Sequence, residues 1–396
     1  MINDYWDYYE PDCSWDSGRL GSLVQTTRQR LSNVGFTTTE AEALWNSGYV
    51  VMGPPGFEVV VDRYYGGAIS VTDGRTRFPI SSLKDQVLEK RNVDGPNIWL
   101  KDARSLIEVQ EIVSFARSQT ESRLVLRGQT SHYRLERELP NPFLFHPEIG
   151  ETSLIASVWR PMLRTNPSYF GHFVNWSLLE WSSVLTEGFD ADYVFRHGVE
   201  TIRSGGLPMT ISDMCDSDDP QIRRYGEFRY RLARGFNDHL LSGLSTLLQH
   251  YGLYSPLVDL TDDVDVAIFF ATHRFRSLDG KASYEPCGSN RDEAVIYILR
   301  YDELEMKPYG RDEVIGALHP LRPERQQCAV ALSDAFSVNL PADFLVGVIR
   351  LRGNSFENQR YTQEDLFPPI ADDNFLRALK DHPFASNRVT DFHRTV

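Results

Sequence analysis

Short apolar runs, rich in β-branched residues, dominate the last third of this chain, and helical patterns precede them. The runs at 294–299, 328–332 and 344–351 are each bounded by charged or turn-forming residues, which is typical of buried strands. Earlier, apolar residues recur at helical spacing through 105–117 and 222–248. This order of elements predicts an α+β fold, with a central sheet of short strands and a helical layer.

A turn-forming stretch at 93–97 divides the chain. Before it, an Asp73-Gly74 turn between two apolar runs predicts a hairpin. A length of 396 residues also favours more than one folding unit. We therefore expect residues 1–95 to form a small β-rich module with a surface for a protein partner, and residues 96–396 to form a larger domain with a helical insertion.

Polar residues predict helix starts near residues 39 and 261, and a further one at Thr152. Thr39, with Glu42 three residues later, matches a capping box. Thr261 or Asp262 is expected to cap a second helix, whose apolar residues begin at Val266.

Charge and hydropathy exclude several classes of partner. The formal net charge of −14 would repel a phosphate backbone, so we do not expect bulk binding to nucleic acid. No apolar stretch has membrane-spanning length, and the first residues are acidic where a secretory signal would be basic. These features favour a cytoplasmic protein without a membrane partner.

The cysteines and the common motifs narrow the chemistry further. Four cysteines lie far apart without CxxC spacing, which favours free thiols in a reducing compartment and gives no sign of a metal centre. The chain also lacks a phosphate-binding loop, an HExxH pair and a GxSxG elbow. A standard ATPase, zinc protease or hydrolase is therefore disfavoured. The cysteines are Cys13, Cys215, Cys287 and Cys328.

Three segments place polar residues at the end of an apolar strand or helix, where side chains commonly line a cleft. They are Leu126-Arg127-Gly128-Gln129, then Gln249-His250-Tyr251-Gly252-Leu253 with the following Leu257-Val258-Asp259-Leu260-Thr261 and residues 267–271, and finally Arg325-Gln326-Gln327-Cys328-Ala329-Val330.

The candidate site residues each have a functional and a structural interpretation. Arg127 has a planar fork suited to a phosphate or carboxylate, or it forms a buried pair with Asp259. Gly128 would let a ligand approach the backbone. His250 contacts a ligand, or it satisfies a helix end, and Tyr251 stacks on a ring or fills core.

Two further candidates complete the set. Thr261 is a cap that can also face the cleft. Gln327 offers a donor and an acceptor to a ribose hydroxyl, or it is satisfied by backbone.

Taken together, the three segments resemble the FRG domain, a bacterial family named for its Phe-Arg-Gly-like motif, and the resemblance covers the C-terminal three quarters of the chain. Leu126 stands in place of the family's Phe, and Tyr254-Ser255-Pro256 stands where the family usually has Pro-Thr-Arg. Cys328 replaces a Gly of the third segment.

The FRG pattern is in turn remotely similar to the site of ADP-ribosyltransferase folds, in which Arg or His anchors NAD and a late acidic residue stabilises the developing cation. That similarity implies an NAD cofactor, bound by Arg127, Gln129, His250, Tyr251, Asp259 and Thr261. It implies catalytic roles for Gln327 and, because Gln is neutral, for Glu324 in reserve. The expected function is an NAD-consuming transferase or glycohydrolase, such as a toxin or defence effector. The alternative is a non-catalytic module that senses a nucleotide or peptide.

Overall fold

The computed structural model describes residues 27–52, 59–62, 64–65, 75–91, 93–156, 193, 197, 210–235, 246–247, 249–252, 255, 257–278, 281–287, 293–308, 320–332, 338–356 and 359–381. The Asp73-Gly74 turn and residues 236–245 of the predicted helical stretch lie outside the described residues. Among the helices in these ranges, none is long and apolar enough to cross a membrane.

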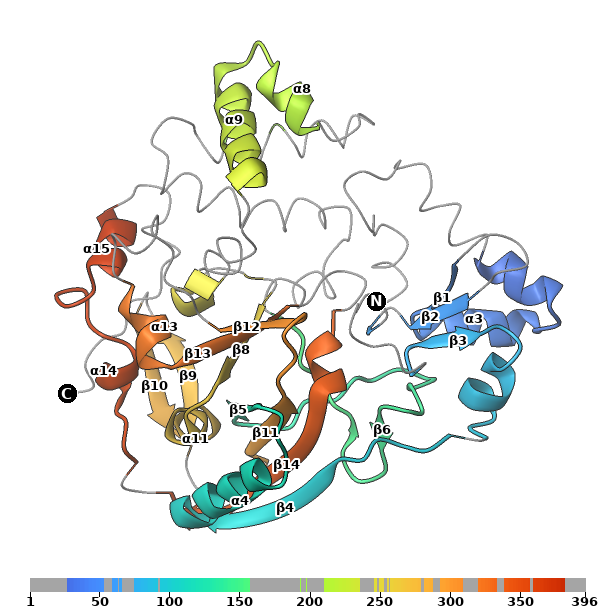
Figure 1. Ribbon diagram of the computed structural model, residues 1–396, viewed down its shortest axis with the longest axis horizontal. Helices are drawn as coiled ribbons and strands as arrows, with labels where there is room; N and C mark the ends of the chain where they lie inside the picture. The colour runs from blue at the N-terminus through green and yellow to red at the C-terminus, as the bar shows by residue number, and fades with distance from the viewer. Residues whose placement is uncertain are drawn as a thin grey trace.

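A seven-stranded mixed sheet forms the centre of the protein. Its strands are β4 (Trp99–Ser105), β5 (Leu124–Gln129), β8 (Leu257–Thr261), β11 (Val295–Arg300), β12 (Met306–Pro308), β13 (Cys328–Leu332) and β14 (Leu345–Ser355). The order across the sheet is β12-β13-β8-β5-β11-β14-β4 (Figure 1). All neighbours are antiparallel except β14 and β4, which run parallel. The three strands predicted from the late apolar runs are β11, β13 and β14 of this sheet.

Both faces of the sheet are buried. Two helices, α4 (Leu106–Ser118) and α11 (Val264–Thr272), cover one face and share a core cluster with Ile296 and Ile298 of β11. The intervening residues Tyr297 and Leu299 belong to the cluster on the other face. This alternation follows from the two-residue period of a strand. A mixed sheet packed against helices confirms the predicted α+β class.

The helix α11 starts later than predicted. Its cap is Asp263, whose Oδ1 accepts hydrogen bonds from the backbone N–H groups of Asp265 at 2.8 Å and Val266 at 3.4 Å. Strand β8 continues through Thr261, so the chain needs two more residues to turn into the helix. The Thr261 hydroxyl accepts a hydrogen bond from the Asp263 N–H at 3.0 Å instead of capping the helix itself.

The N-terminal region has its own antiparallel sheet, β1 (Tyr49–Met52), β2 (Val59–Asp62) and β3 (Arg77–Pro79), packed on helix α3 (Thr38–Asn46) (Figure 1, blue). The capping box of α3 is formed by Thr37 and Glu40, two residues before the predicted pair. The reason is that Thr37 has the extended backbone that a cap needs, whereas Thr39 already lies inside the helix.

This N-terminal region shares buried surface with the central sheet. Trp45, Val50, Tyr64 and Tyr65 lie in the same core cluster as Val125 of β5. The strands of the two regions do not pair, yet the side chains between them form one core. A separately folding unit that ends near residue 95 stays a prediction.

Shorter elements complete the described part of the chain. They are η1 (Lys84–Leu88), β6 (Phe145–His146), β7 (Gly150–Glu151), α8 (Ile211–Cys215), α9 (Pro220–Gly235), β9 (His273–Leu278), β10 (Lys281–Pro286), α13 (Leu321–Arg325), η3 (Leu340–Phe344), α14 (Gln363–Leu366) and α15 (Asn374–Asp381). The hairpin β9–β10 and the segment before β13 matter most here, because both contribute to the cavity described next.

Candidate functional site

A cavity of about 160 Å³ lies where the three motif segments meet. Strand β5, strand β8 and the chain around residue 250 form its walls, and helix α11, the hairpin β9–β10 and the turn before β13 close it. The lining residues are Leu126, Arg127, Gly128, Gln249, His250, Asp259, Leu260, Thr261, Val266, Phe270, Tyr284 and Gln326.

The cavity exists because β5 and β8 separate after a single point of pairing. Leu126 lies opposite Thr261, and no further residues of these two strands are paired. One residue later, a side-chain hydrogen bond replaces backbone pairing between the two strands. The Nη1 atom of Arg127 donates to the carbonyl oxygen of Asp259 at 2.6 Å. The diverging strands thus leave a polar opening inside an otherwise apolar sheet.

Arg127 retains an unused donor. Its Nε–H is buried and has no hydrogen-bond partner. Burial lowers the pKa of Arg127 from its usual range, and the nearby Asp259 carboxylate opposes this effect. A buried guanidinium N–H without a partner is unusual, because buried polar groups are normally hydrogen-bonded. The side chain is therefore suited to bind an acceptor in the cavity.

Gly128 has a different role from the one expected. A Cβ atom at this position would lie 1.8 Å from the carbonyl oxygen of Ala267 and 2.8 Å from the backbone nitrogen of Ala271. Helix α11 therefore fills the space beside Gly128, and the glycine permits close helix–strand packing instead of ligand approach.

His250, Asp259 and Cys328 form a polar cluster at the cavity. The Nε2 atom of His250 lies 3.1 Å from the Cys328 Sγ and 3.6 Å from the Asp259 Oδ1. The side chain of His250 is 2% exposed, and that of Asp259 is 29% exposed. Burial lowers the pKa of His250 from its usual value and raises the pKa of the Cys328 thiol. Both groups are thus favoured in their neutral forms.

Tyr251 and Gln129, two residues of the predicted site, lie outside the cavity lining. The Tyr251 hydroxyl donates to Asp373 Oδ2 at 2.5 Å, and its ring packs edge-on against Phe375. Gln129 ends β5, beyond the cavity, and its Oε1 is buried without a partner. The structure therefore gives Tyr251 a packing role and separates Gln129 from the other candidates.

Thr261 lines the cavity, but its hydroxyl already forms two hydrogen bonds within the protein. It donates to the carbonyl oxygen of Gln326 at 2.8 Å and accepts from the N–H of Asp263. Thr261 thus ties strand β8 to the turn before β13 and has little capacity left for a ligand.

Neither residue expected to act in catalysis lines the cavity. Gln327 is exposed, and its Nε2 donates to Asp263 Oδ2 at 2.9 Å. Its φ of 44° places it in the left-handed region, and the neighbouring Gln326 lines the cavity in its place. Glu324 lies in the short helix α13, away from the lining. The tight left-handed turn between α13 and β13 is the reason that Gln326, and not Gln327, lines the cavity.

Sequence reasoning missed several residues that shape the site. Phe270 and Tyr284 supply two aromatic rings whose centroids lie 5.7 Å apart, and both line the cavity. Arg322 is fully buried, donates to the carbonyl oxygen of His250 at 3.2 Å and lies over the Tyr251 ring. Phe270 lies in the last part of the second motif segment, residues 267–271, and the nearby pair of Arg322 and Arg325 indicates a local basic site. Tyr284 carries no local signal, because only the tertiary fold brings it here.

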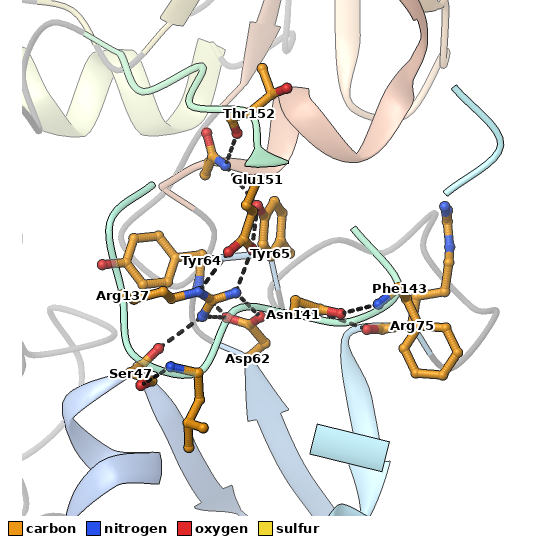
Figure 2. Close-up of polar contacts among 12 residues, drawn as sticks. Ser47, Asp62, Tyr64, Tyr65, Arg75, Arg137, Asn141, Phe143, Glu151 and Thr152 are labelled. Carbon is orange, nitrogen blue, oxygen red and sulfur yellow. Dashed lines mark hydrogen bonds and ion pairs between the residues drawn. The ribbon is translucent and has the colours of Figure 1, made fainter. Parts of the chain in front are cut away.

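A second charged cluster lies between the N-terminal sheet and the segment that carries β7 (Figure 2). Arg137 donates to Asp62 Oδ2 at 2.7 Å and to Glu151 Oε1 at 2.5 Å, and its Nη1 reaches the Ser47 carbonyl oxygen at 2.8 Å. The three charged side chains are at most 1% exposed. Asn141 also donates to Asp62. Because these groups are buried and satisfy one another, the cluster is structural.

Larger hollows exist among the described residues, with volumes of about 470, 510 and 630 Å³. The first contains an ion pair between Arg75 and Asp343, and the third is an apolar groove beside α4 that includes Trp99 and Phe115. None of them contains a residue of the three motif segments. The smaller cavity is the candidate site because the three motif segments meet there.

Comparison with known proteins gives one match. No curated protein and no solved structure matches the chain. A family model described as the FRG domain matches residues 217–279. This range contains the second motif segment, strand β8 and helix α11, which together provide His250, Asp259 and Phe270 of the cavity. The match confirms, over residues 217–279, the resemblance to the FRG domain that the motifs indicate.

Proposed function

We propose that the cavity binds the nicotinamide end of an NAD-type dinucleotide. The observation that carries this proposal is the unpartnered Nε–H of Arg127 in a cavity that also holds Asp259 and two aromatic rings. A carboxamide oxygen can accept from Arg127, and a planar ring can lie against Phe270 and Tyr284.

The cavity is large enough to hold one end of the dinucleotide but not the whole molecule. At about 160 Å³ it is smaller than the roughly 300–1,000 Å³ of pockets that enclose drug-sized ligands. A single ring with its carboxamide is of suitable size. The ribose and phosphates would then lie outside the cavity.

The charges favour the nicotinamide end over a phosphate. Arg127 and Asp259 line the cavity together, and their formal charges cancel. A phosphate would gain from Arg127 but would be repelled by the Asp259 carboxylate at short range. A cationic pyridinium ring, by contrast, is favoured by the carboxylate and by the aromatic faces.

Any cleavage of the nicotinamide bond would depend on Asp259. It is the carboxylate at the cavity, and a carboxylate stabilises an oxocarbenium-like transition state. The positions of Gln327 and Glu324, outside the lining, favour a second candidate function, which is a non-catalytic module that senses a nucleotide. Nicotinamide release by wild type but not by Asp259→Asn would support catalysis, and binding without release would support the sensing module.

Calorimetric titration with fragments of NAD tests the binding mode. Nicotinamide mononucleotide should bind wild type, and Arg127→Met should weaken this binding roughly tenfold or more, because hydrogen bonds to charged groups contribute about 1.5–3 kcal/mol. ADP-ribose, which lacks the nicotinamide, should be insensitive to the substitution. The matched control is Arg104→Met, an exposed arginine at the end of β4. Tighter binding of ADP-ribose than of the mononucleotide would contradict the orientation.

A further inference from the structure

Three potential metal ligands meet at the inner side of the cavity. Within the part of the chain that the structure describes, His250, Asp259 and Cys328 form a group of side chains whose ligand atoms all lie within 4.8 Å of one another. The atoms are an imidazole nitrogen, a carboxylate oxygen and a thiol sulfur. The spacing of these residues in the sequence did not predict a metal site, because they come from three separate segments of the chain.

The fold holds these three residues in place. Cys328 of β13 pairs with Thr261 of β8, and Val330 pairs with Asp259. Because side chains alternate along a strand, Cys328 and Asp259 lie on the same face of the paired strands. His250 approaches from the chain before β8, and Arg322 fixes its carbonyl oxygen. The fold therefore brings the three ligand atoms together.

The same atoms have poor partners within the protein. The Asp259 Oδ1 is buried and accepts no hydrogen bond. The Cys328 thiol has a 3.3 Å contact with the carbonyl oxygen of its neighbour Ala329 and a 3.1 Å contact with His250. Buried polar groups in folded proteins are normally satisfied. A cation bound between the three atoms would satisfy all of them.

We propose that His250 Nε2, Asp259 Oδ1 and Cys328 Sγ bind a zinc ion. A mixed set of imidazole, carboxylate and thiolate ligands is typical of zinc. With Zn–N of about 2.0–2.1 Å and Zn–S of about 2.3 Å, a tetrahedral angle separates nitrogen from sulfur by about 3.5 Å. The observed 3.1 Å therefore needs to open by only a few tenths of an ångström.

The charges are compatible with this site. The thiolate and the Asp259 carboxylate would balance the two positive charges of zinc, and Arg127, which donates to the Asp259 carbonyl oxygen, would leave the region with a net positive charge. Zinc and a cationic pyridinium ring would therefore compete for Asp259. Three protein ligands leave a fourth position for water or an anionic group from the cavity. The site does not depend on NAD binding, since its occupancy can be measured without a nucleotide.

Metal content of the full-length protein tests the proposal directly. After incubation with zinc and extensive dialysis, wild type should retain about one zinc per chain. Cys328→Ala and Asp259→Asn should each lose most of it, while Cys287→Ser, which alters a partly buried thiol outside the cavity, should retain it. Circular dichroism checks that each variant is folded. Equal zinc retention by wild type and Cys328→Ala would overturn the proposal, as would no retention by wild type.

Replacing zinc with cobalt gives a spectroscopic test that does not depend on whether the Cys328→Ala and Asp259→Asn variants fold. Cobalt bound to a thiolate gives a charge-transfer absorption band, so a chain in which Cys13, Cys215 and Cys287 are all replaced by serine should still show this band. Loss of the band from that chain would overturn the assignment of Cys328. Zinc should also raise the melting temperature of wild type and leave that of Asp259→Asn unchanged. An equal rise in both would count against the site.

Discussion

Arg127 and Arg137 lie close in the sequence, yet their surroundings differ in kind. Arg137 donates to Asp62, Glu151 and the Ser47 carbonyl oxygen, and its side chain is 1% exposed. Arg127 makes one hydrogen bond, keeps a buried N–H without a partner and borders a cavity. Both arginines neighbour carboxylates, so proximity to charge does not distinguish them.

The difference teaches how a buried charge can be assigned to stability or to binding. A guanidinium whose donors are satisfied inside the protein holds elements together, and removing it leaves uncompensated carboxylates. A guanidinium with an unused donor beside a cavity still has binding capacity. We therefore expect Arg137 to determine stability and Arg127 to determine ligand affinity, and substitutions can separate these two roles.

The largest effect is expected at Arg137. Arg137→Met should reduce the free energy of unfolding by about 3–5 kcal/mol, because Asp62 and Glu151 would remain buried and charged without their partner. Urea denaturation measures this loss. Adding Asp62→Asn and Glu151→Gln should recover part of it by removing the uncompensated charges. A loss below about 1 kcal/mol in Arg137→Met would mean that the network contributes little.

Gly128→Ala should have the next largest effect. The new Cβ would clash with the backbone of α11 at Ala267, which cannot move as a flexible side chain would. Overpacking of this kind typically reduces stability by about 1–3 kcal/mol. Thermal unfolding checks the prediction, with Gly95→Ala as a control because a Cβ at Gly95 meets only one atom, at 3.7 Å. Equal melting temperatures for both variants would contradict the close packing of α11 on β5.

Arg127→Met should change stability less than either substitution, by about 1 kcal/mol, the typical value of one hydrogen bond. Its carboxylate neighbour, Asp259, is partly exposed and can be solvated through the cavity. Urea denaturation of the Arg127→Met and Arg137→Met variants in parallel compares their losses of unfolding free energy. Losses of the same size at both arginines would remove the distinction between the two regions.

Gln327→Ala is expected to have the smallest effect. The side chain is exposed and bonds only to Asp263 Oδ2, so the change in stability should lie within about 0.5 kcal/mol. Affinity for nicotinamide mononucleotide should also stay unchanged, because Gln327 lies outside the cavity. Calorimetry that showed a tenfold loss of affinity would place Gln327 back in the site.

Local patterns predicted the parts of the fold that local physics determines. Periodicity was sufficient for helix α4 and for the strands β11, β13 and β14, since each has a continuous apolar pattern. The capping sites predicted near residues 39 and 261 were displaced by one or two residues, to Thr37 and Asp263. Several polar residues can cap in each case, and backbone conformation decides between them. The cap predicted at Thr152 was wrong, because Thr152 forms an antiparallel bridge with Arg134.

The candidate site was predictable where the motif segments themselves form its wall. Arg127, His250 and Asp259 lie together as expected, and Gln327 does not, because a left-handed turn replaces an extended strand entry. The Arg137 network had no local signal, since its partners Asp62 and Glu151 are distant in sequence. Contacts of this kind depend on tertiary packing, which no short window of sequence contains.

The central claim is that the unused donor of Arg127 serves a ligand, and the stability of the protein with and without NAD tests it most directly. With NAD at about one hundred times its dissociation constant, wild type should gain about 2.7 kcal/mol of stability. The Arg104→Met control should gain the same amount, and Arg127→Met should gain at least about 1.4 kcal/mol less, which corresponds to tenfold weaker binding. An equal gain in Arg127→Met, or no gain in wild type, would contradict the account.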